Sequence, residues 1–244
     1  MGIHVGTSGW SYAHWEGTLY PPGTPPAARL ALYCGRFATV ELNASFYRWP
    51  SDRTFAGWRR RLPDGFQLSV KAPRGLTHAK RLYAPEAWVE RIAASWHELS
   101  SRRGVLLVQL APAHERDDAR LEYFLARLPD WISVSVEFRH PSWHADEVFH
   151  LLERHRAAYC VMSGAGLPCI LRATAPLATS ACTDPTITSC TAVATRWTSC
   201  AGGRTAFGSG AAAGTMSTPT STTTGTAMPC ATPRRWSPCS RTDS

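Results

Sequence analysis

The sequence predicts a parallel α/β fold, and specifically a TIM-like (β/α) barrel. Short apolar runs rich in β-branched residues recur along the chain, as expected for strands that are buried on both faces of a parallel sheet. Amphipathic helical patterns separate these runs, which indicates repeated βα units. No glycine-rich fingerprint follows the first run, so the pattern favours a barrel over a dinucleotide-binding sheet.

The pattern predicts six strands and five helices in the first two thirds of the chain. The strands are expected at His4–Trp10, Thr39–Phe46, Phe66–Ala72, Val105–Ala111, Ile132–Phe138 and Ala158–Met162. The helices are expected at Ala27–Arg36, Thr54–Arg61, Pro85–Ser101, Asp117–Leu128 and Ala145–Arg156. Pro85 suits the first turn of a helix, and Asp117 complements the positive end of a helix dipole. Because a closed barrel of this kind has eight strands, two strands are missing.

The composition changes abruptly at Ala178. The remaining residues include no Lys and no Glu and are mostly Thr, Ala, Ser, Gly and Pro, a composition typical of disorder. A one-base shift of the reading frame explains the change better. In the shifted frame, the codons of residues 179–185 and 215–225 can encode a seventh strand and an eighth strand. We therefore predict an incomplete βα-barrel domain over residues 1–177 and an out-of-frame, disordered tail over 178–244.

Bulk properties restrict the class of protein. The chain contains no run of eighteen apolar residues and no basic, apolar leader, so we expect no membrane association and a cytoplasmic location. The net charge of +8 would suit phosphate or nucleic acid, but an arginine-rich proteome gives the same excess. The eight cysteines form no CxxC pair, so no metal site is predicted, and no cofactor is identified.

Candidate site residues are sought at the C-terminal ends of the strands, where βα-barrels place their active sites. The predicted catalytic residues are Glu41, Lys71, His78 and Glu137. The predicted substrate-binding residues are Trp10, Tyr12, Asn43, Tyr47, Gln109, Arg139 and His140.

Glu41 and Glu137 lie inside otherwise apolar strands, and burying a carboxylate without a partner is costly. Each is interpreted as a base, a metal ligand or an acceptor for a sugar hydroxyl, or else as half of a structural ion pair with Lys71 or Arg139. Lys71 is interpreted as a phosphate ligand or a base, or as charge balance for the two carboxylates. His78 is an acid–base candidate or an ordinary surface histidine.

The binding residues have similar alternatives. Arg139 and His140 would clamp an anion, or cap the helix that follows. Asn43 and Gln109 would recognise hydroxyl groups, or bridge neighbouring loops. The aromatic side chains, of which Trp10 and Tyr47 are the best candidates, would stack on a ligand ring or pack at the rim of the barrel.

Six runs, GTSGWSYAHW, LYPPG, TVELNASFYRWP, FQLSVKAPRGLTHAKRL, LLVQLAP and SVEFRHPSW, occur in order between Ile3 and Leu177. They closely resemble the domain-of-unknown-function 72 family of YecE-like proteins. The resemblance implies a TIM-like barrel of the kind compared with sugar isomerases and endonucleases, and it implies no established activity.

Three functions stay open at this point. The leading hypothesis is an enzyme that acts on a polyhydroxylated or phosphorylated small molecule, as a sugar isomerase does. The alternatives are a barrel that binds or processes nucleic acid and a non-catalytic domain that binds a small molecule. Because six strands cannot close an eight-stranded barrel, we expect the chain as it stands to be inactive.

Sequencing the coding DNA across the codons for Thr174 to Thr179 tests the frame hypothesis. We expect a missing or extra base there, whose correction restores two barrel strands. An uninterrupted frame shared by closely related genes would show that the tail is the genuine end of the gene product.

Overall fold

The computed structural model describes residues 3–164, 166–183 and 195–197. Within these residues the strands are β1 (Ile3–His4), β2 (Thr39–Leu42), β3 (Gln67–Lys71), β4 (Arg103–Gln109), β5 (Val134–Glu137), β6 (Ala158–Gly164), β7 (Leu177–Thr183) and β8 (Thr195–Trp197). The helices are α1 (Pro26–Cys34), α2 (Ala44–Tyr47), α3 (Asp52–Arg61), α4 (Glu86–His97), α5 (Asp118–Arg127) and α6 (Asp146–Arg154). The short turns are the 3-10 helices η1 (Ala13–Trp15), η3 (Ser100–Arg102) and η4 (Pro141–Trp143) and the π-helical turn η2 (Gly75–Ala79).

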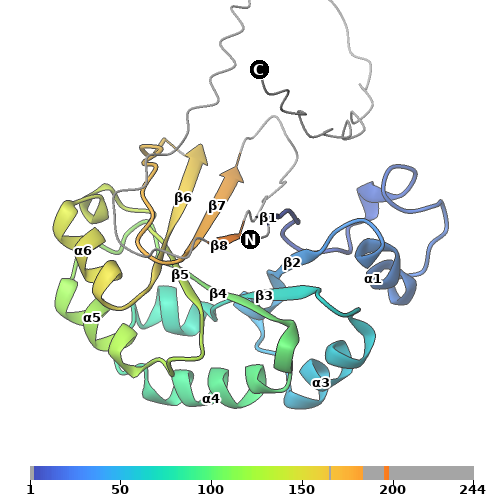
Figure 1. The fold of residues 1–244 in the computed structure, drawn as a ribbon, viewed down its shortest axis with the longest axis horizontal. Coiled ribbons are helices and arrows are strands. Elements are labelled where there is room, and N and C mark those ends of the chain that lie inside the picture. Colours follow the sequence, from blue (N-terminus) through green and yellow to red (C-terminus); the bar gives the residue numbers. More distant parts are fainter. Residues whose placement is uncertain (1–2, 165, 184–194, 198–244) are drawn as a thin grey trace, which may run out of the picture. The chain divides into compact units, whose positions relative to one another are not determined.

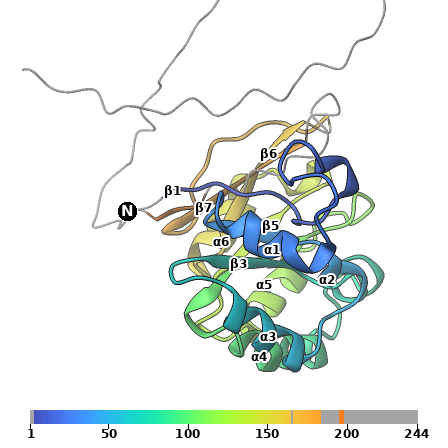
Figure 2. The same cartoon turned by 90° about the vertical axis from the view of Figure 1, so that its right-hand side faces the viewer.

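Strands β2 to β7 are parallel and adjacent in chain order, and they form a curled half-barrel (Figure 1). Helices α3, α4, α5 and α6 follow one side of this curved sheet (Figures 1 and 2). This arrangement confirms the TIM-like α/β prediction. Its consequence for function is that the C-terminal ends of β2, β3, β4 and β5 lie at one edge of the sheet.

The first predicted strand is shorter than expected. Only Ile3–His4 forms β1, which pairs antiparallel with β8, whereas the next residues pair with β2. Gly9 N donates to the carbonyl of Glu41 at 2.7 Å, and Glu41 N donates to the carbonyl of Thr7 at 3.0 Å. A Cβ on Gly6 would lie 2.2 Å from the carbonyl oxygen of Thr39. Glycine therefore allows this segment to take the first-strand position beside β2.

The second predicted strand also ends early, because residues 44–47 turn into α2. The hydroxyl of Ser45 donates to the carbonyls of Leu42 and Lys71, at 2.7 Å each. These bonds satisfy carbonyls at the ends of β2 and β3 and favour a turn over a continued strand. The turn leaves Tyr47 82% exposed.

The predicted boundary at residue 177 falls too early. Leu177–Thr183 forms β7, which pairs parallel with β6 from Cys160 opposite Thr179 onward. The buried hydroxyls of Thr179 and Ser135 are hydrogen-bonded to each other, so this strand packs into the sheet. Most of the predicted tail, residues 184–194 and 198–244, lies outside the described residues, as does the predicted eighth strand of the shifted frame.

Capping and core packing explain the helix ends. The side chain of Ser51 accepts from Thr54 N at the start of α3, and Asp117 accepts from Arg120 N at the start of α5. Trp143 is fully buried and stacks on Phe138 with ring centroids 5.0 Å apart.

In the part of the chain that the structure describes, no helix has both the length and the apolarity needed to cross a membrane.

Gly104 in β4 offers a test of the packing of the half-barrel. A Cβ at this position would lie 2.5 Å from Ser69 Oγ and 2.8 Å from Ser69 N. Ser69 lies where the β3–β4 register shifts, and its Oγ accepts from Val105 N at 3.1 Å. We expect Gly104→Ala to lower the free energy of unfolding by about 1–3 kcal/mol, measured by urea denaturation.

Gly57 in α3 provides the matched control, because the nearest atom to its added Cβ would be 4.0 Å away. Gly57→Ala should stabilise the protein by about 1 kcal/mol through helix propensity. Equal stability of the two variants would contradict the described contact between β3 and β4.

Candidate functional site at the barrel mouth

Two carboxylates are buried at the ends of β2 and β5, as their apolar surroundings predicted. Glu41 is 3% exposed and Glu137 is 2% exposed. Glu137 accepts a hydrogen bond from Gln109 Nε2 at 2.6 Å and forms an ion pair with Arg139. Because Gln109 and Glu137 are register partners on β4 and β5, the sheet itself positions this contact. The ion-pair alternative considered for the buried carboxylates is therefore realised at Glu137.

Glu41 is held differently. Its Oε1 accepts from the hydroxyl of Ser8 at 3.1 Å, and Ser8 Oγ accepts from the amide of Asn43. Burial raises the pKa of Glu41 to about 7, since the charged form loses its hydration. The charge of Lys71 opposes this rise in pKa, and the charge of Glu137 adds to it. A carboxyl with this pKa can release or accept a proton near neutral pH.

A cavity of about 630 Å³ opens above these carboxylates, and we call it the mouth cavity. It is lined by Tyr12, Asn43, Phe46, Tyr47, Lys71, Arg74, His78, Gln109, Pro112 and Arg139. Seven of the eleven predicted site residues are in this lining. Among the described residues, three that line the cavity are Lys or Arg and none is Asp or Glu, so this part of the wall is cationic.

His78 lies on the π-helical turn η2, beside Lys71 and Phe46. Its Nδ1 is hydrogen-bonded to Thr77 Oγ1 at 2.9 Å, and its ring meets the ring of Phe46 edge-on at 4.9 Å. Desolvation, followed by the charges of Lys71, Arg74 and Arg139, lowers the pKa of His78. The imidazole is therefore neutral at pH 7 and can accept a proton.

Aromatic rings complete the wall. Lys71 Nζ lies 5.1 Å from the centroid of the Phe46 ring, which positions the ammonium group at the cavity edge. The hydroxyl of Tyr12 donates to the carbonyl of Ser8, and burial raises the pKa of this phenol. Tyr12 is thus a neutral hydrogen-bonding group next to Asn43.

Four predicted residues lie outside the lining. Glu137 contacts the lining residues Gln109 and Arg139 directly, whereas Glu41 is linked to the lining residue Asn43 through Ser8. Trp10 meets Trp58 edge-on, with centroids 5.9 Å apart, and packs against the hydrophobic core. His140 Nδ1 accepts from Ser142 N at 3.3 Å and caps η4. The packing and capping alternatives therefore describe Trp10 and His140.

Sequence reasoning missed three lining residues, Phe46, Arg74 and Pro112, of which Arg74 carries a charge. It follows Pro73 just beyond the end of β3 and directly precedes η2. The feature of the sequence that could have identified Arg74 as a site residue is its closeness to the end of β3. An exposed arginine in a loop resembles many others, and only the π-helical turn shows that it faces the same cavity as His78.

Comparisons with known proteins agree with this architecture. The family model described as "Protein of unknown function DUF72" matches residues 4–199. UPF0759 protein YunF of Bacillus subtilis (strain 168) is 29% identical over 150 residues, which is 58% of this chain and 52% of that protein. UPF0759 protein YecE of Escherichia coli (strain K12) is 28% identical over 144 residues, 59% of this chain and 50% of that protein. The chain spans about half the length of these curated relatives.

Two solved structures resemble the fold. A DUF72 family protein from Thermotoga maritima MSB8 superposes with a TM-score of 0.66 at 29% identity, covering 73% of each chain. A DUF72 family protein from Enterococcus faecalis V583 gives a TM-score of 0.63 at 16% identity, covering 73% of this chain and 70% of that one; at this identity the likeness concerns the fold alone. The family match starts at residue 4 and continues past residue 177 to residue 199, and we conclude that this chain belongs to the DUF72 family.

Proposed function

We propose that the mouth cavity binds an anionic, polyhydroxylated small molecule and that the protein is an enzyme that moves a proton on this molecule. The observation that carries the proposal is the cationic wall. Lys71, Arg74 and Arg139 line one cavity, and no carboxylate belongs to its lining in the part of the chain that the structure describes. Such a wall attracts phosphate or carboxylate groups.

Hydroxyl recognition is assigned to the amides. Gln109 contributes its side chain to the cavity wall while its Nε2 donates to Glu137. Asn43 also lines the cavity, and its amide donates to Ser8. Each amide has a carbonyl oxygen that can accept from a ligand hydroxyl. The buried carboxylates fix the orientation of these amides, directly in one case and through Ser8 in the other.

Proton transfer is assigned to His78 and Glu41. His78 lines the cavity and is neutral at pH 7, so it can take a proton from a ligand carbon next to a carbonyl. In an isomerisation, this proton returns to the former carbonyl carbon, and the hydroxyl proton moves from the neighbouring oxygen to the former carbonyl oxygen, so no atom is gained or lost. Lys71 and Arg139 stabilise the negative charge that develops on the ligand oxygen. Glu41, which is linked to Asn43 through Ser8, is a second group that can accept or release a proton near pH 7.

A non-catalytic binding domain is the second candidate. The ion pair between Glu137 and Arg139 favours it, because a carboxylate oxygen that already accepts from a guanidinium and an amide has less room to contact a ligand. The two candidates differ in one observable result: an enzyme of the proposed kind exchanges a ligand proton with solvent, and a binding domain does not.

Lys71→Met tests the anion site. Glucose 6-phosphate and fructose 6-phosphate are titrated into the full chain by calorimetry. We expect the variant to bind at least about tenfold more weakly, because a charge-assisted hydrogen bond is lost. Lys80→Met is the matched control, since Lys80 is exposed and lies outside the cavity lining. Equal losses in both variants would contradict a specific site.

His78→Asn and Glu41→Gln test the chemical step. Sugar phosphates are incubated with the protein in D₂O, and deuterium uptake at the carbon next to the carbonyl is followed by NMR. The described lining residues of the mouth cavity all lie between Tyr12 and Arg139, so this cavity is present without the two missing strands. Against the inactivity expected from the strand count, we therefore expect deuterium uptake with the wild type, and at least about a hundredfold slower uptake with either variant. Binding without deuterium uptake in the wild type would reject the enzyme in favour of the binding domain.

A further inference from the structure

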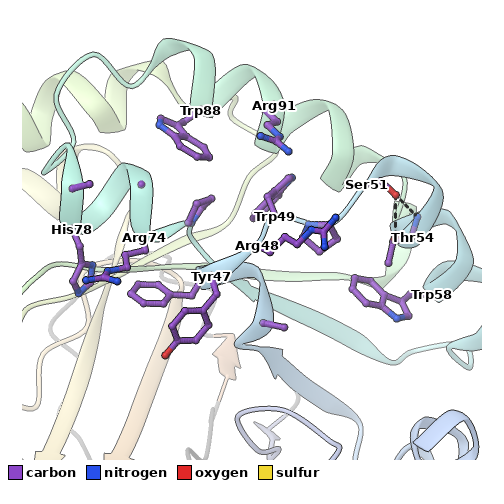
Figure 3. Close-up of a pocket in the computed structure, with 16 residues that line it drawn as sticks. Tyr47, Arg48, Trp49, Ser51, Thr54, Trp58, Arg74, His78, Trp88 and Arg91 are labelled. Atoms are coloured by element: carbon purple, nitrogen blue, oxygen red, sulfur yellow. Dashed lines mark hydrogen bonds between the residues drawn. The ribbon is translucent and has the colours of Figure 1, made fainter.

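A second, larger cavity of about 1,090 Å³ adjoins the mouth cavity, and we call it the arginine groove (Figure 3). Its lining comes from α2 and α3, from η2, and from α4. Four residues, Phe46, Tyr47, Arg74 and His78, line both cavities. The two cavities are therefore neighbours, and a ligand anchored in the mouth cavity can extend past these residues into the groove.

The groove is cationic. Arg48, Arg74 and Arg91 line it, and no Asp or Glu of residues 3–164, 166–183 or 195–197 does. Within the described residues, these three guanidinium groups have no ion pair and no hydrogen bond, whereas Arg116 and Arg172 each bind two carboxylates. Guanidinium groups whose donors are unused by the protein are suited to phosphate oxygens.

The groove is also aromatic. Trp49, Trp58 and Trp88 line it together with the rings of Phe46 and Tyr47. Trp88 lies directly on the backbone of η2, since a Cβ on Gly75 would be 2.5 Å from its Cζ2. Trp88 and Arg91 extend from α4 toward the segment that carries Arg48 and Trp49 (Figure 3). Tyr47 is 82% exposed at the junction of the two cavities, where a planar ring could stack on it.

We infer that the mouth cavity and the arginine groove together bind a sugar nucleotide. The sugar lies in the mouth cavity against Asn43 and Gln109, the phosphates lie at the junction near Arg74 and His78, and the base stacks on the aromatic rings of the groove. This inference rests on the proposed function and names its substrate class. A sugar phosphate alone would leave the groove unused. A nucleic-acid strand would place phosphates, rather than hydroxyl groups, against the amides of the mouth cavity.

Calorimetric titration of the full chain with four probes tests the inference: UDP-glucose, ADP-glucose, glucose 1-phosphate and oligothymidylate. We expect at least one sugar nucleotide to bind at least tenfold more tightly than glucose 1-phosphate. Arg48→Ala and Arg91→Ala change residues that line the groove and are not in the lining of the mouth cavity. They should weaken sugar-nucleotide binding at least fivefold and leave glucose 1-phosphate binding unchanged. Both residues are exposed, and unchanged thermal midpoints verify that the variants fold.

Arg59→Ala is the matched control, because Arg59 is an exposed arginine of α3 that does not line the groove. It should leave the affinity for every probe unchanged.

Sugar nucleotides that bind no more tightly than glucose 1-phosphate would overturn the inference and leave the proposed function intact. Sugar nucleotides that bind through Arg91 while Lys71→Met has no effect would support the groove and reject the anion site at Lys71. Oligothymidylate binding that depends on Arg91, without sugar-nucleotide binding, would overturn the inference in favour of single-stranded nucleic acid.

Discussion

The carboxylates of Glu41 and Glu137 are buried at the ends of β2 and β5. The polar groups of the barrel mouth are arranged around these two side chains. A buried charge without a partner is strongly destabilising. Glu137 meets this constraint through Arg139 and Gln109, and Glu41 meets it through Ser8 and a pKa near 7. The parallel sheet provides the partners of both glutamates. It brings neighbouring strand ends to one edge, where Gln109 meets Glu137, and it places the first segment of the chain, which carries Ser8, beside β2.

The charge balance of the site follows from this arrangement. One cation, Arg139, is paired with a carboxylate beneath the cavity, while Lys71 and Arg74 line the wall without an ion pair among the described residues. The cationic excess therefore faces the cavity and the negative charge lies below it. A site built in this way binds anions from above and keeps its carboxylates available to orient amides or to exchange a proton.

The parallel strands and the buried glutamates could be predicted from sequence because both are local patterns. An apolar β-branched run predicts a buried strand, and a charged residue within it predicts a buried charge. The early end of β2 could not be predicted, because Ser45 bonds the carbonyl of Lys71 on another strand. Trp10 and His140 were assigned to the site for a similar reason: their actual partners are Trp58 on a distant helix and a helical turn. The composition after Ala178 predicted disorder, but residues 178–183 belong to β7. The small side chains of Thr, Ala and Ser suit a strand that packs closely against β6.

The protonation of Glu41 is the most direct test of this account. Its pKa is raised from 4.5 to about 7 in the folded protein, so its contribution to stability is fully present below pH 4.5 and is lost as pH rises through 7. Urea denaturation from pH 5 to pH 8 compares the wild type with Glu41→Gln, and with Glu90→Gln as an exposed control. The account predicts that the wild type loses about 2–3 kcal/mol relative to Glu41→Gln between pH 5 and pH 8. Glu90→Gln keeps Glu41 and should therefore lose stability in step with the wild type. Parallel curves for the wild type and Glu41→Gln would contradict a carboxyl that titrates inside the barrel mouth.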